Sequence, residues 1–185
     1  MSHPFLNLTP PQRKRLFWLF LALTLLTTAV LQIIDGALQT TAAPQGIVSY
    51  ELAGNAATAG NILASWDAAA RLHAAFSLGF DFLYMLAYTV TLALAALWLA
   101  DDFSGLSRHI GILLAWGAGI AGVADAMENY FLWRMLINGP SDAAAMIAHG
   151  AALIKFTLIL LAFFYFIIAL LMVFFRNRRG PNAQH

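Results

Sequence analysis

The feature that most limits how this chain can fold is a set of four long apolar segments almost free of charge. The first, Leu16–Ile34, contains no charged residue, and the stretch Phe82–Ala100 is equally uncharged. A helix needs roughly 20 apolar residues to cross a bilayer. We therefore expect an all-α integral membrane four-helix bundle forming a single domain over residues 1–185. The expected spans are 16–36, 77–100, 110–133 and 153–175, with an outer segment at 37–73.

Composition supports a membrane protein. The chain is 61% hydrophobic and 10% charged, whereas a soluble domain carries about 25% charge. It has no cysteine, which excludes disulfides, thiolate nucleophiles and Cys-ligated metals or clusters. No basic run interleaved with aromatic residues points to nucleic acid. We expect the lipid bilayer as a partner, no nucleic acid and no cofactor.

The beginning of the chain allows two interpretations. Thr9 and Gln12 form a helix-start pattern just before the basic residues Arg13–Arg15. Thr41–Ala43 resembles the small-residue cleavage site of a signal peptide. The apolar run Leu16–Ile34 is longer than the 7–15 residues usual for a signal peptide, which favours a retained membrane anchor.

Basic residues predict the orientation of the spans. Most of the ten Lys and Arg residues flank the terminal side of the expected bundle. Cytoplasmic flanks are enriched in Lys and Arg. We expect an inner-membrane protein with both termini cytoplasmic and an outer cap formed by the segment between the first two spans. The terminal-side residues are Arg13, Lys14, Arg15, Arg108, Arg176, Arg178 and Arg179.

The outer segment also has a local pattern. Ile47–Leu52 could be an extended strand, and Asn55–Trp66 suits an interfacial helix ending in an aromatic residue. Asp67 is a plausible N-cap for the long helix that follows. This segment could cover the outer end of the bundle.

The third span contains the densest polar pattern. Asp125, Glu128 and Asn129 are spaced so that they share one helix face. Gly119 and Gly122 lie on the same stripe, where small residues allow a neighbouring helix to approach closely. Charges in a membrane helix are expensive and should face protein or water.

Charges on all four spans fall at similar depths. Counting about 1.5 Å per residue from the cytoplasmic ends places Asp35, Asp81, Glu128 and Lys155 near the outer edge of the hydrocarbon, with Asp125 about one turn deeper. One interpretation is that these charges only mark the membrane boundary, with Lys155 snorkelling and aromatic residues forming an interfacial belt. Another is a structural pair that joins Asp125 or Glu128 to Lys155.

The remaining interpretation is an outward-facing polar pocket between the second, third and fourth spans. It would bind, and possibly act on, an amphipathic or cationic ligand, in a cavity of at least ~300 Å³. No catalytic residue can be named, because no serine has a nucleophile elbow. The expected ligand-binding residues are Asp81, Tyr84, Tyr88, Asp125, Glu128, Asn129 and Lys155.

Two other functions and a metal site compete with the pocket. The protein could be a non-catalytic assembly partner that packs through Gly117, Gly119 and Gly122, or an oligomeric ion- or proton-coupled carrier. No acid lies near mid-membrane, where coupling sites usually occur, which disfavours the carrier. We expect no metal; the weak candidate ligands are His73, His149 and Glu51, which lack a metal-binding spacing.

Overall fold

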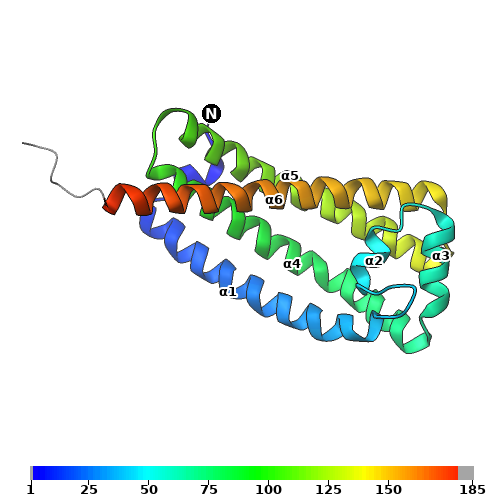
Figure 1. The fold of residues 1–185 in the computed structure, drawn as a ribbon. Coiled ribbons are helices and arrows are strands. Elements are labelled where there is room, and N and C mark those ends of the chain that lie inside the picture. Colours follow the sequence, from blue (N-terminus) through cyan, green and yellow to red (C-terminus); the bar gives the residue numbers. More distant parts are fainter. Residues whose placement is uncertain (1, 179–185) are drawn as a thin grey trace, which may run out of the picture.

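Four long helices dominate the computed structural model, which describes residues 2–178 (Figure 1). All four are long and apolar enough to cross a membrane, and the expected all-helical class is confirmed for the described residues. Each helix begins before its expected span, and α4, α5 and α6 also end beyond theirs. The bounds are α1 Pro10–Asp35, α4 Ala68–Asp101, α5 Gly105–Asn138 and α6 Asp142–Arg178.

The long helices pack in the order α1, α4, α5, α6, with a smaller contact between α4 and α6. Both described ends of the chain lie at the same end of the molecule (Figure 1). We call this the terminal end and the opposite one the cap end. Arg179, one of the basic residues on which the orientation was predicted, lies outside the described residues.

The segment between α1 and α4 covers the cap end (Figure 1). It contains the short helices η2 (Gly36–Leu38), α2 (Ile47–Glu51) and α3 (Ala56–Ser65). The predicted helix at Asn55–Trp66 is confirmed, as is Asp67 as the N-cap of α4, whose side chain accepts from the Ala70 N–H.

The extended strand expected at Ile47–Leu52 is wrong, because these residues form α2. A short apolar run does not distinguish strand from helix. Here a residue distant in the sequence favours the helix. The Asp35 carboxylate, at the end of α1, accepts a hydrogen bond of 2.7 Å from the Ile47 N–H. This contact satisfies a backbone donor in the first turn of α2. Gly46 precedes it with φ of 56°, a conformation that favours glycine.

An apolar core at the cap end holds the segment against the long helices. The Trp66 indole is 3% exposed and donates to the Leu38 carbonyl at 2.9 Å. The Tyr50 hydroxyl donates to the Leu132 carbonyl of α5 at 3.1 Å. Trp66 therefore does not belong to an interfacial aromatic belt. Its ring packs edge-on against Tyr50, 5.3 Å between centroids.

A second core closes the terminal half between α4 and α5. It is built from small and aliphatic residues around Leu97 and Ile112. The N-terminal helix η1 (Pro4–Asn7) packs on this core through Phe5 and Leu6. The residues before α1 are therefore partly packed against the long helices.

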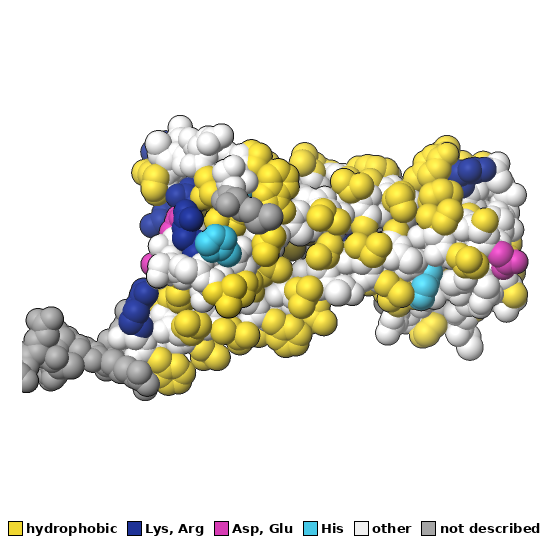
Figure 2. All heavy atoms as spheres, turned by 90° about the horizontal axis from the view of Figure 1, so that it is seen from above, with side chains coloured by type: hydrophobic (Ala, Val, Ile, Leu, Met, Phe, Trp, Pro, Cys, Tyr) yellow, Lys and Arg dark blue, Asp and Glu magenta, His cyan; other side chains and the backbone are white. Residues whose placement is uncertain are grey.

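The surface matches a protein surrounded by lipid. Figure 2 shows hydrophobic side chains along the length of the visible face, with charged side chains gathered at its two ends. Leu26, Val123 and Phe163 are examples of large apolar side chains that remain exposed on three different helices. Exposed apolar surface of this extent is expected for helices that cross a bilayer.

Candidate functional site

Lys155 is the centre of a buried cluster of charges near the cap end. Its ammonium lies 2.9 Å from the Glu128 carboxylate, 3.1 Å from Asp125 and 3.4 Å from Glu51. Lys155 is only 7% exposed, and Glu128 and Asp125 are 0% and 1% exposed. Three carboxylates from two parts of the chain thus surround one cation. We call these four residues the lysine cluster.

This geometry corrects the interpretation that the charges only mark the membrane boundary. A snorkelling lysine would extend its ammonium to the membrane surface, but Lys155 directs it between α5 and α2. Asp125 is also enclosed by protein. The structural pairing expected between α5 and α6 is present, and it includes both Asp125 and Glu128.

The polar face of α5 forms as its spacing predicts. Asp125, Glu128 and Asn129 are all buried. Asp125 accepts a hydrogen bond of 2.9 Å from the Tyr88 hydroxyl of α4, in addition to its contact with Lys155. Because charge-assisted hydrogen bonds hold its carboxylate from two helices, Asp125 ties α4, α5 and α6 together.

Asp81 and Tyr84 complete the predicted stripe on α4. The Asn129 amide donates to the Asp81 carboxylate at 2.6 Å, and the Tyr84 ring packs on Tyr88 with centroids 5.1 Å apart. Both Asp81 and Tyr84 are half-buried. The expected α4 residues therefore lie next to the α5 residues, but their role in ligand binding stays a prediction.

Glu51 is the member of the lysine cluster that the sequence pattern did not identify as part of the pocket. It was only a weak metal candidate, because its position depends on how the segment between α1 and α4 folds. In the structure, α2 places it over the long helices and against Lys155. Burial raises the pKa of the Glu51 carboxyl, and the nearby Lys155 charge opposes that shift only in part.

A small cavity with both polar and apolar lining residues adjoins the lysine cluster. Its volume is about 90 Å³, roughly that of three water molecules. The expected volume of at least ~300 Å³ is therefore wrong, because α2 occupies much of the space above α4 and α5. The cavity lies between α1, α2, α4 and α5, so α6 does not line it. Its lining residues are Leu31, Gln32, Asp35, Ile47, Val48, Glu51, Ser77, Leu78, Asp81 and Asn129.

Three of the lining residues are carboxylates: Asp35, Glu51 and Asp81. They come from α1, α2 and α4, so the acidic lining requires the folded segment over the long helices. Gln32, Ser77 and Asn129 add amide and hydroxyl groups. This set of oxygen ligands favours a small cation over an anion or a purely apolar molecule.

The candidate metal ligands do not come together. His73 is exposed on α4, and His149 on α6 lies beside Gly54 of the segment over the long helices. Glu51 contacts Lys155 instead of either histidine. Within residues 2–178, no group of three His, Asp or Glu side chains has an arrangement that could hold a metal ion.

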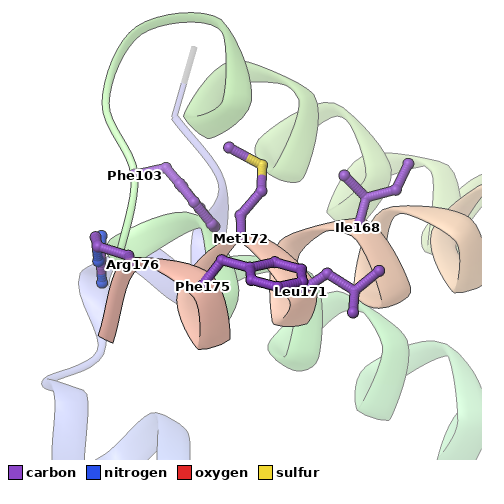
Figure 3. A pocket seen from close by; sticks show the side chains of 6 residues that line it. All are labelled: Phe103, Ile168, Leu171, Met172, Phe175 and Arg176. Atoms are coloured by element: carbon purple, nitrogen blue, oxygen red, sulfur yellow. The ribbon is translucent and has the colours of Figure 1, made fainter. Parts of the chain in front are cut away.

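A larger, apolar groove of about 600 Å³ lies at the terminal end, far from the lysine cluster (Figure 3). Phe103, from the connection between α4 and α5, extends toward Met172 of α6 (Figure 3). Arg176 at its edge donates to the Asp102 carbonyl at 2.9 Å. Apart from Arg176, the lining is apolar and lies on the outside of the spanning helices, so that it suits lipid acyl chains.

The glycines of α5 differ in what they contact. A Cβ on Gly122 would lie 2.8 Å from Thr89 of α4, and one on Gly117 would lie 3.5 Å from Leu158 of α6. Both glycines therefore serve packing within the chain, and the close approach predicted at Gly122 is confirmed. Gly119 meets no atom of this chain within 4 Å, so its packing against another protein stays a prediction.

Comparison with known proteins does not add to these features. Neither a protein-family model, nor a curated protein, nor a solved structure matches this chain. Function is therefore inferred from the spanning helices, the lysine cluster and the acidic cavity.

Proposed function

We propose that this is a multi-pass inner-membrane protein with a site for a small cationic group at its cap end. The observation that carries the proposal is that three carboxylates, Asp35, Glu51 and Asp81, line one cavity next to a cluster that already holds more acids than bases. Buried carboxylates are stable when a positive charge or a proton compensates them. A bound cation would supply that charge.

The size of the cavity limits the ligand. A space of about 90 Å³ accommodates ammonium or methylammonium, but not a drug-sized or amphipathic molecule, whose pockets start at about 300 Å³. The amphipathic ligand that the sequence suggested would fit only through a small cationic end. We therefore narrow the proposed ligand to a small monovalent cation.

The proposed orientation places this site on the outer side. Support comes from the basic residues Arg13, Lys14 and Arg15 at the terminal end, which the positive-inside rule assigns to the cytoplasm. Ser49 in α2 and Ser104 before α5 lie at opposite ends of the molecule and can therefore test its orientation in the membrane. In intact cells, an impermeant thiol reagent should label Ser49→Cys and leave Ser104→Cys unlabelled. The reverse pattern contradicts the orientation.

Binding is tested by titrating purified protein in detergent with ammonium chloride or methylammonium chloride, with choline chloride keeping the ionic strength constant. We expect a saturable increase in melting temperature for at least one small cation, and none for choline, which exceeds the cavity. Asp81→Asn should weaken the response, because loss of one charged contact of about 1.5–3 kcal/mol corresponds to roughly a tenfold or greater loss of affinity.

The matched control is Asp102→Asn, which removes a half-exposed carboxylate at the terminal end. It should leave the cation response unchanged. Equal responses of Asp81→Asn, Asp102→Asn and the unmodified protein would show that the cations act on the surface and that the cavity is not their site.

Of the competing functions, assembly through the α5 glycines is less favoured. Two of the three glycines proposed to contact a partner, Gly117 and Gly122, already pack against helices of this chain. The ion- or proton-coupled carrier stays a prediction. The hydroxyls of Thr24 on α1 and Thr91 on α4 form a hydrogen bond of 3.1 Å, which extends the polar contacts from the cavity toward the terminal end. Beyond it, the apolar core around Leu97 closes the terminal half.

A further inference from the structure

The lysine cluster has an imbalance of charge. Three carboxylates, those of Glu51, Asp125 and Glu128, surround the single ammonium of Lys155. Arg71, the basic residue closest in sequence to the segment over the helices, donates instead to the Leu63 and Trp66 carbonyls. Within the part of the chain that the structure describes, no second Lys or Arg pairs with these acids. A cluster of this kind, removed from water, requires added positive charge.

Two of the acids contact the same ammonium. The carboxylates of Glu51 and Glu128 lie 3.4 Å and 2.9 Å from the Lys155 nitrogen, and Glu128 is 0% exposed. The Glu128 Oε2 atom is buried, and the Lys155 ammonium, although 2.9 Å away, does not make a well-directed hydrogen bond to it. Neighbouring carboxylates removed from water do not both ionise, and one of them keeps a proton. A proton between Glu51 and Glu128 would give this oxygen a directed hydrogen bond.

The acid pair is placed between the cavity and the lysine cluster. Glu51 lines the cavity and also contacts Lys155, whereas Glu128 contacts Lys155 without lining the cavity. Charged groups from every adjoining long helix face this region. These are Asp35 of α1, Asp81 of α4, Asp125 of α5 and Lys155 of α6.

We propose that Glu51 and Glu128 share one proton, and that a monovalent cation entering the adjacent cavity releases it. The cation brings one positive charge, the carboxylic O–H bond breaks, and the proton passes to water, so that the net charge of the site is unchanged. This inference rests on the proposed function and names its regulation: cation and proton compete for one site. Low pH therefore weakens cation binding.

The test combines binding and proton release on the same sample. Unmodified protein in weakly buffered detergent solution is titrated with methylammonium chloride while a pH dye reports protons and calorimetry reports binding. We expect about one proton released per cation bound. Binding without proton release overturns the exchange but leaves the proposed function intact, whereas absence of both overturns the two proposals together.

Infrared difference spectroscopy locates the proton independently. The unmodified protein at neutral pH should show the carbonyl stretch of a protonated carboxylic acid, and cation addition should remove it. The band should be missing in both Glu51→Gln and Glu128→Gln, and should persist in the control Asp102→Asn. A band that persists in either glutamine variant places the proton elsewhere and refutes the shared pair. If a variant does not fold, the loss of the carbonyl band on adding the cation to the unmodified protein decides whether a carboxylic acid releases its proton.

Discussion

Replacing Lys155 by methionine tests the lysine cluster most severely. Methionine keeps most of the side-chain volume and removes the ammonium that contacts Glu51, Asp125 and Glu128. Breaking a buried ion pair by removing one partner costs about 3–5 kcal/mol, and here three acids lose their common partner. For a chain of this size each kcal/mol shifts the melting temperature by roughly 2–4 °C. We expect a decrease of about 6–20 °C by thermal unfolding in detergent.

The control is Lys14→Met, because Lys14 is exposed at the terminal end and should contribute less than about 1 kcal/mol. Asp125→Asn should also destabilise the protein, since Asp125 contacts both Tyr88 and Lys155. The double variant with Lys155→Met should lose less than the sum of the two single losses. A Lys155→Met protein as stable as the Lys14→Met protein would refute the buried cluster.

Three further predictions follow from particular residues. Gly46→Ala should impair folding strongly, because its φ of 56° disfavours side chains and a Cβ would collide with the Asp35 carboxylate; a normal melting temperature contradicts this. Gly111→Ala should destabilise the protein, since its Cβ would lie 2.6 Å from the Tyr165 hydroxyl, 2.7 Å from the Ala100 side chain and 3.0 Å from the Ala96 carbonyl oxygen. Gly119→Ala, in open space, should be neutral or stabilising by up to ~1 kcal/mol. Thermal unfolding of the two variants measures the difference, and equal losses of stability contradict the prediction. Because burial raises the Glu51 pKa in the folded state, Glu51 stabilises the fold at pH values below its ordinary pKa of 4.5 and loses that contribution as the pH rises. The melting temperature of Glu51→Gln should therefore decline less steeply with rising pH than that of the unmodified protein. An unchanged slope contradicts the assignment.

The long helices and the polar face of α5 were predictable from the sequence. Apolar runs report span length directly, and the spacing of Asp125, Glu128 and Asn129 fixes their common face whatever they pack against. Capping patterns are equally local, as Asp67 illustrates. These features depend on residues a few positions apart.

The lysine cluster and the cavity were only partly predictable, because they depend on distant contacts. Glu51 reaches Lys155 only after α2 folds, and α2 is positioned by Asp35 from the end of α1. The sequence pattern at Ile47–Leu52 does not contain that information, so it was interpreted as a strand. The same fold of α2 explains why the cavity is smaller than expected and why Asp35 lines it.

The central claim is that a small cation binds among Asp35, Glu51 and Asp81. X-ray diffraction from crystals of the protein grown with methylammonium chloride measures this most directly, because a bound ion appears as difference density at a defined position. We predict difference density for methylammonium inside the cavity, which disappears in Asp81→Asn and persists in Asp102→Asn. A cavity without this density, in crystals where methylammonium appears elsewhere on the protein, would contradict the claim.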